Sequence, residues 1–140
     1  MTSRDLAESY LAKAELRLKA LAVLRDGGGH SDVIREAQEL VELALKGVLR
    51  AIGVEPPKHH DVGGLLLEHR GKIAEESRGD LERAAAVSKR LRKERELAFH
   101  GDIDFIPTEE HTAADATRAY DDAAWVVALA RNIVKVLPGS

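Results

Sequence analysis

Arg95 and His100 are the residues of this sequence whose types and spacing best suit chemistry at a phosphate group. A guanidinium binds phosphate oxygens through paired hydrogen bonds, and an imidazole exchanges protons near neutral pH. Arg95 falls on the inward stripe of a predicted helix, and His100 stands directly before Gly101, where that helix is expected to end. A charge on an inward stripe is costly unless it faces a partner, a cleft or a ligand. The stripe consists of Leu81, Ala84, Ser88, Leu91, Arg95 and Ala98.

The same spacing also fits a purely structural interpretation. In that interpretation Arg95 reaches the surface along its aliphatic stem, and His100 does no more than end the helix. The residue types leave both interpretations open, so the surrounding elements have to separate them.

Charge is distributed unevenly along the second half of the chain. Residues 89–95 hold five basic side chains and a single acid, Glu94, whereas residues 102–122 hold seven acids and a single arginine, Arg118. The basic stretch suits a surface that follows a nucleic-acid backbone. A basic helix followed by an acidic one equally suits pairing between neighbouring helices. The candidate phosphate-binding residues are Lys89, Arg90, Arg92 and Lys93.

The composition is that of one folded domain over residues 1–140. Hydrophobic residues make up 44% and charged residues 32%, which excludes a disordered chain, and the formal net charge is −3. The absence of cysteine excludes disulfides, thiolate zinc sites and cysteine nucleophiles. The histidines lack the spacing of a helical metal site, so we expect no metal and no other cofactor. Because no apolar segment has the length of a membrane span, we expect a cytoplasmic protein without a membrane partner.

The spacing of apolar residues predicts an all-α fold, an antiparallel bundle of four or five helices, and no segment alternates as a strand would. Glycine and proline mark the helix ends, because glycine adopts left-handed conformations and proline lacks an N–H group. The first expected helix follows Thr2 or Ser3 and stops at residues 27–29, and the second is capped by Ser31 or Asp32 and stops at Gly53. A short third helix runs from about Asp61 to Gly71. The fourth runs from about Asp80 to His100, and the last includes residues 116–137.

The order of these features resembles the HEPN domain family of small helical-bundle proteins. Arg95-x4-His100, at the end of the fourth predicted helix, matches the family's Arg-x(4–6)-His motif. The part of the chain before the motif is similar to the family in its helix, its loop and its His-Asp entry, at residues 37–46, Gly53, Pro56-Pro57 and His60-Asp61. The loop after the motif and the last helix also fit, so the resemblance covers nearly the whole chain.

The resemblance implies a homodimer, or a dimer with a related domain, that brings two Arg-His motifs together at its interface. Many family members are metal-independent ribonucleases that act as toxins or in defence, and others are inactive binding modules, often beside a small nucleotidyltransferase. For this chain the family implies a catalytic role for Arg95 and His100. Asp102 stands where partnered toxins often carry a tyrosine. Glu96 stands where catalytic members commonly carry a polar residue, and its charge can either hold Arg95 or weaken the attraction for phosphate.

The leading hypothesis is a dimeric, metal-independent endoribonuclease with Arg95 and His100 at its interface. RNA cleavage needs a base for the 2′-hydroxyl and an acid for the leaving 5′-oxygen, and two His100 side chains related by a two-fold axis can divide these tasks. The two Arg95 side chains would then hold the phosphate. The alternative is a non-catalytic module that binds a nucleotide or a partner nucleotidyltransferase, which Glu96 and the acidic chain favour. A third hypothesis is a bundle whose Arg95 pairs with the acidic last helix.

Overall fold

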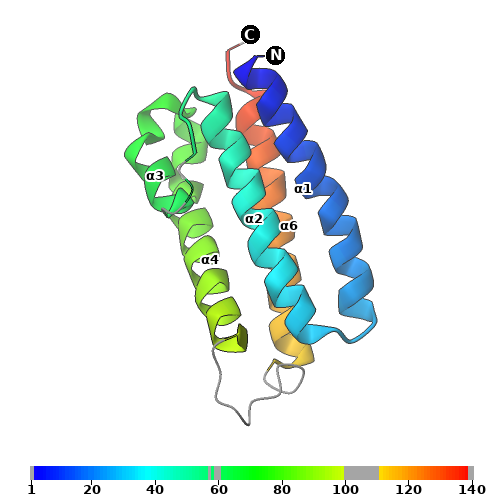
Figure 1. Cartoon of the computed structure of the whole chain (residues 1–140). Coiled ribbons are helices and arrows are strands. Elements are labelled where there is room, and N and C mark those ends of the chain that lie inside the picture. Colours follow the sequence, from blue (N-terminus) through cyan, green and yellow to red (C-terminus); the bar gives the residue numbers. More distant parts are fainter. Residues whose placement is uncertain (1, 57, 59–60, 100–110, 139–140) are drawn as a thin grey trace.

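The computed structural model describes residues 2–56, 58, 61–99 and 111–138, and for residues 97–99 the backbone only. All regular structure in these ranges is helical, which confirms the predicted all-α bundle (Figure 1). The elements are α1 (Ser3–Asp26), α2 (His30–Ala51), α3 (Val62–Glu68), the short 3-10 helix η1 (Arg70–Lys72), α4 (Glu75–Phe99) and α6 (Ala113–Lys135).

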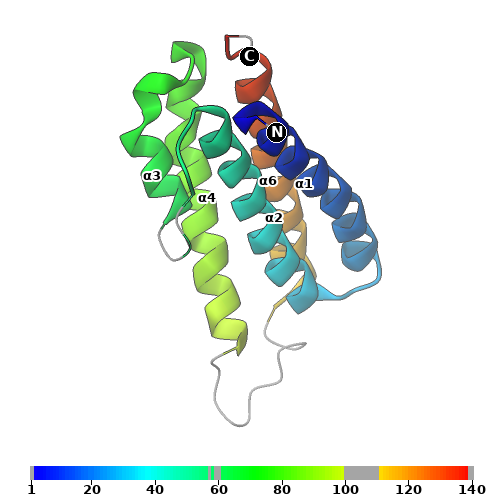
Figure 2. The same ribbon diagram turned by 45° about the horizontal axis from the view of Figure 1, so that its top comes forward.

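The four long helices form an antiparallel bundle with α2 at its centre (Figure 1). α2 packs against α1, α4 and α6, and α6 also contacts α1 and α4. Figures 1 and 2 both show α3 beside the first half of α4, at the end of the bundle where the two termini lie. The end of α4 and the start of α6 lie at the opposite end, so the helix that carries Arg95 finishes far from the termini.

The buried core is built largely on α2 and α6. Half of α2 is buried, eleven of its 22 residues, as expected for a helix enclosed by three others. Alanine recurs on the buried face of α6 and allows α2 to approach closely. Gly47 does the same between α1 and α2, since a Cβ atom at this position would lie 3.2 Å from the Cβ atom of Tyr10. The buried alanines of α6 are Ala116, Ala119, Ala123 and Ala130.

α4 begins at Glu75, earlier than the predicted start near Asp80. Tertiary and backbone contacts fix the chain before that point. Ile73 is buried, and its carbonyl oxygen accepts a hydrogen bond from Arg78 Nε at 2.9 Å. The Ser77 N–H group donates to the Ala74 carbonyl at 2.9 Å. These bonds order the first turn of α4, which therefore begins five residues before the predicted start near Asp80.

The starts of α2 and α3 also differ from the predicted caps. α2 begins at His30 with Gly29 as its N-cap, because the Gly29 carbonyl accepts the hydrogen bond from the Val33 N–H group at 2.9 Å. Ser31 and Asp32 therefore lie inside the first turn. Asp61 does occupy the N-cap of α3, but its side chain makes no capping hydrogen bond. The predicted stops at residues 27–29 and at Gly53 are confirmed.

A capping box fixes the start of α6 at Thr112. The Thr112 N–H group donates to Asp115 Oδ2 at 2.9 Å, and the Asp115 N–H group donates to Thr112 Oγ1 at 3.1 Å. The bond from the Thr112 backbone is the largest cause that lowers the pKa of the Asp115 carboxyl. The carboxylate form of Asp115 therefore stabilises the folded chain.

Replacing Asp115 by asparagine is expected to lower the free energy of unfolding by about 0.5 kcal/mol at neutral pH, a small effect because the carboxylate is exposed. Since the folded pKa lies below the unfolded one, the stabilisation is complete above about pH 4 and is lost as the pH falls through the folded value. Urea unfolding of wild type and variant at neutral and acidic pH measures this difference. Asp80→Asn, at an exposed position of α4, is the matched control. A difference that does not shrink in acid would contradict the assignment to the Asp115 charge.

Candidate functional site

Arg95 lies on α4 and extends toward α2. Its Nη1 atom donates a hydrogen bond to Gln38 Oε1 at 2.5 Å, and its Nη2 atom lies 3.3 Å from Glu39 Oε1. Gln38 is 4% exposed, whereas the Arg95 side chain keeps 31% exposure. Arg95 therefore sits at the edge of the α2–α4 interface, with part of its side chain in contact with solvent. The predicted stripe that precedes it on α4 is buried at Leu81, Ala84, Ser88 and Leu91.

The contacts with α2 orient the Arg95 guanidinium. An arginine has five N–H donors in a planar fork, and the two contacts on α2 engage one edge of that fork. Gln38 is neutral, and Glu39 also lies 3.8 Å from Arg17 Nη1 on α1. Arg17, Arg95 and Glu39 thus carry one net positive charge between them. Such a held guanidinium is suited to binding an anion such as a phosphate group.

The structure divides the four predicted phosphate-binding residues into two groups. Lys89 and Lys93 are exposed on the outer face of α4. Arg90 forms an ion pair with Asp122 of α6, and its Nε atom lies 3.5 Å from Glu94 Oε1. Arg92 forms an ion pair with Glu42 of α2. The arginines thus join α4 to its neighbours, while the lysines point to solvent.

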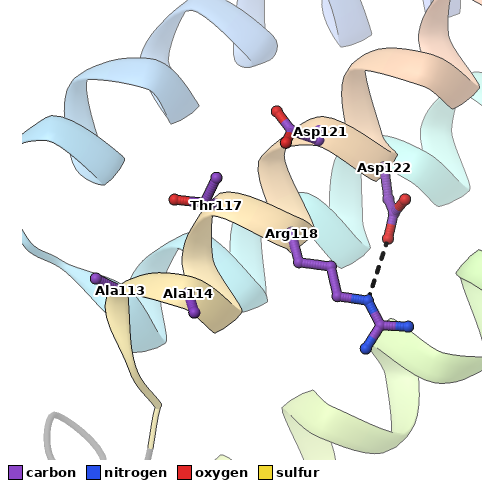
Figure 3. A pocket seen from close by; sticks show the side chains of 6 residues that line it. All are labelled: Ala113, Ala114, Thr117, Arg118, Asp121 and Asp122. Atoms are coloured by element: carbon purple, nitrogen blue, oxygen red, sulfur yellow. Dashed lines mark ion pairs between the residues drawn. The ribbon is translucent and has the colours of Figure 1, made fainter.

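No sequence pattern singled out Asp122, yet this carboxylate is where three arginines meet. Besides Arg90 it faces Arg83 of α4 and Arg118, its neighbour one turn earlier on α6. Figure 3 shows the Arg118–Asp122 pair beside a shallow hollow on the first turns of α6. Only the Arg118–Asp122 spacing of four residues is a sequence signal, typical of an ion pair on one helix face. The approach of Arg83 and Arg90 depends on how α4 packs against α6.

Several residues of the sequence hypothesis lie outside the described residues. These are Pro57, His60, His100, Gly101 and Asp102. Glu96, the acid that follows Arg95, is exposed on α4.

Comparison of the sequence with models of known protein families gives a match that covers most of the chain. The sequence model of the HEPN domain matches residues 7–134. This chain belongs to the HEPN domain family. No curated protein and no solved structure matches it significantly. The family match confirms the resemblance over nearly the whole chain and includes the position of Arg95 in α4.

The HEPN bundle also holds a histidine pair to which no sequence pattern pointed. His30, the first residue of α2, places its Nδ1 atom 3.2 Å from the carbonyl oxygen of His111. His111 is 8% exposed, and its Nε2 atom is buried without a hydrogen-bond partner among the described residues. The pair links the start of α2 to the residue before the Thr112 cap, which helps to fix the start of α6.

The part of this HEPN chain that the structure describes contains neither a cluster of metal ligands nor a membrane-spanning helix. There, no group of three or more histidine and carboxylate side chains is arranged to hold a metal ion. Several carboxylates in these ranges face arginines instead, as Glu39, Glu42 and Asp122 do. None of the described helices is both long and apolar enough to cross a membrane.

Proposed function

We propose that this HEPN protein is a metal-independent endoribonuclease that acts as a dimer, with Arg95 and His100 as its catalytic residues. The observation that carries the proposal is the Arg95 side chain, which Gln38 and Glu39 hold near the end of α4 while part of it stays exposed. His100 follows five residues later in the sequence, as in the motif of the family. RNA in the cytoplasm is the proposed substrate, in a toxin or defence role.

The proposed reaction is a transesterification followed by release of the 5′ product. One His100 takes the proton of the 2′-hydroxyl, and the 2′-oxygen attacks the phosphorus atom. The bond from phosphorus to the 5′-oxygen breaks, and the second His100, from the partner subunit, gives its proton to that oxygen. The products are a 2′,3′-cyclic phosphate and a 5′-hydroxyl, so atoms and charges balance without a metal ion.

Arg95 supplies positive charge to the phosphate in this mechanism. The five-coordinate phosphorus of the transition state carries more negative charge on its oxygens than the ground state does. A guanidinium that α2 already orients can stabilise that charge without having to reorganise. Lys89 and Lys93, exposed on the same helix, are proposed to contact the RNA backbone away from the cut.

A second candidate function is a non-catalytic module that binds a nucleotide or a partner nucleotidyltransferase. The observation that favours it is the presence of two carboxylates near Arg95. Glu39 of α2 pairs with Arg95, and Glu96 follows it in sequence and is exposed. Two carboxylates reduce the attraction of Arg95 for a phosphodiester. The first candidate predicts that RNA is cut, whereas the second predicts that it is not.

Cleavage of labelled single-stranded RNA in the presence of EDTA tests the proposal. Wild type is expected to leave cyclic-phosphate ends, and His100→Ala is expected to lower the rate by about 100-fold or more, because one residue serves as both base and acid in the dimer. His69→Ala, at the end of α3, is the matched control and should cleave as wild type does. Equal cleavage by His100→Ala and wild type would refute the proposed site. Binding of a nucleotide by wild type, without cleavage of RNA, would favour the second candidate.

A further inference from the structure

Gln38 is the single polar side chain among the eleven buried residues of α2. It is 4% exposed, and its neighbours Ala37, Leu40 and Val41 are completely buried. Burying an amide lowers stability unless the amide is hydrogen-bonded, so an apolar residue would serve the packing of this helix at least as well. A glutamine at this position therefore calls for a reason other than packing.

The hydrogen-bond partner of Gln38 is Arg95, on the neighbouring helix α4. Arg95 Nη1 donates to Gln38 Oε1 at 2.5 Å. A guanidinium carries donors only, so the atom that faces it has to be the oxygen of the amide and not the nitrogen. Because Gln38 is almost fully buried, water competes little for this bond. The bond therefore restrains the guanidinium more than a contact at the surface would.

Glu39, the other contact of Arg95 on α2, is a weaker restraint. Its Oε1 atom lies 3.3 Å from Arg95 Nη2, and its side chain is 36% exposed. Its second oxygen, Oε2, lies 3.8 Å from Arg17 Nη1, so two arginines share the carboxylate. Water and salt weaken ion pairs of this exposure. Of the two contacts, the hydrogen bond to Gln38 is the one that sets the position of the Arg95 guanidinium.

The amide of Gln38 adds no negative charge beside Arg95. A carboxylate at this position would bind the guanidinium more strongly, but it would also attract the positive charge that a phosphate needs. A neutral acceptor orients the guanidinium without competing with the phosphate. The bond is not required as a link between the two helices, because Arg92 of α4 already pairs with Glu42 of α2.

We propose that Gln38 is a positioning residue, a neutral acceptor that holds the Arg95 guanidinium in place for a phosphate group of the RNA. This inference rests on the proposed function, because it gives Gln38 a part in the same cleavage reaction. Gln38 acts through Arg95, whose oriented charge stabilises the transition state without reorganisation. Loss of the Gln38 oxygen should therefore lower kcat and leave KM nearly unchanged.

Gln38→Met tests the hydrogen bond with little change in packing, because methionine is a flexible side chain of similar size without a strong acceptor. Cleavage of labelled single-stranded RNA in EDTA measures kcat and KM. The substitution is expected to lower kcat about tenfold, with KM within about twofold of wild type. In an Arg95→Gln background, where no guanidinium remains to be held, the same substitution should change kcat by less than about twofold.

Glu42→Met is the matched control, since it makes the same substitution one helical turn further along α2, where the arginine contacted is Arg92. It should leave kcat and KM within about twofold of wild type. Gln38→Glu separates orientation from charge at the same position. It should hold Arg95 as firmly as glutamine does, yet lower kcat about tenfold, because the new carboxylate compensates the charge of the guanidinium.

NMR of the arginine-labelled protein measures the position of Arg95 independently of cleavage. Arg95→Gln identifies the signals of Arg95. A guanidinium that is held rotates slowly and gives separate signals for its two Nη groups, whereas a free one gives a single averaged signal. Wild type and Gln38→Glu are expected to show separate signals, and Gln38→Met is expected to show the averaged one.

The proposal would be overturned by equal values of kcat for Gln38→Met and Glu42→Met, or by an equal loss of kcat with and without Arg95. Separate Nη signals that persist in Gln38→Met, or a full rate with Gln38→Glu, would also overturn it. No cleavage by wild type, together with averaged signals in Gln38→Met alone, would refute the ribonuclease activity and still support Gln38 as the residue that holds Arg95.

Discussion

Replacing Arg95 by glutamine is expected to lower the rate of RNA cleavage by about 100-fold or more while the helical fold is retained. The charge that stabilises the transition state is lost, but the amide of glutamine can still meet water at the edge of the α2–α4 interface. Cleavage rates on labelled single-stranded RNA, with circular dichroism of each protein, measure the effect. A fall in kcat with little change in KM would show that Arg95 acts mainly in the transition state.

Arg92→Gln is the matched control for this experiment. Arg92 lies three residues before Arg95 on α4 and also contacts α2, through Glu42. Its loss should leave cleavage within a few-fold of wild type, since ion pairs of this exposure contribute little to binding or stability. If Arg95→Gln cleaves as fast as Arg92→Gln, Arg95 is a structural link to α2 and not a catalytic residue.

Arg95→Lys separates charge from geometry at the same position. A lysine keeps the positive charge but lacks the planar fork with which arginine contacts Gln38 and Glu39 together. Its rate is therefore expected to lie between those of wild type and Arg95→Gln. A full rate with lysine would show that the orientation imposed by α2 does not matter.

The helical fold is predictable from the sequence because it depends on local patterns. Apolar spacing identifies the long helices, and Gly53 ends α2 with a φ of +81°, which other residues rarely adopt. The start of α4 was misplaced because it depends on the burial of Ile73 and on the contacts of Arg78, which no local pattern records. The family was recognisable because the Arg95-x4-His100 motif stands directly before Gly101, a residue that predicts the end of a helix.

The candidate site is predictable only in part, since its contacts join distant residues. Arg95 stood out as a charge on an apolar stripe, but its partner Gln38 is 57 positions away in sequence. That contact depends on the register between α2 and α4, which apolar spacing does not specify. The link from Arg90 to Asp122, 32 positions away, depends in the same way on α4 and α6. Unequal charge along the chain indicated that such pairs exist but not which residues form them.

Gly63→Ala is expected to lower the free energy of unfolding by about 3 kcal/mol, because α3 and α4 touch at this glycine. A Cβ atom here would lie 2.6 Å from the Cα atom of Ala85 and 2.8 Å from its Cβ atom. Both atoms belong to the rigid part of α4, so no side-chain rotation relieves the clash, and α3 has to move away.

Gly79→Ala makes the same substitution on α4 where nothing lies within 4 Å of the new Cβ atom. It is expected to stabilise the protein by about 0.5–1 kcal/mol, since alanine loses less backbone entropy than glycine in a helix. Urea unfolding of the two variants beside wild type should therefore give shifts of opposite sign. If both shifts had the same sign, the close approach of α3 to α4 at Gly63 would be wrong. Because α3 packs on the helix that carries Arg95, Gly63→Ala also tests whether that contact supports the candidate site.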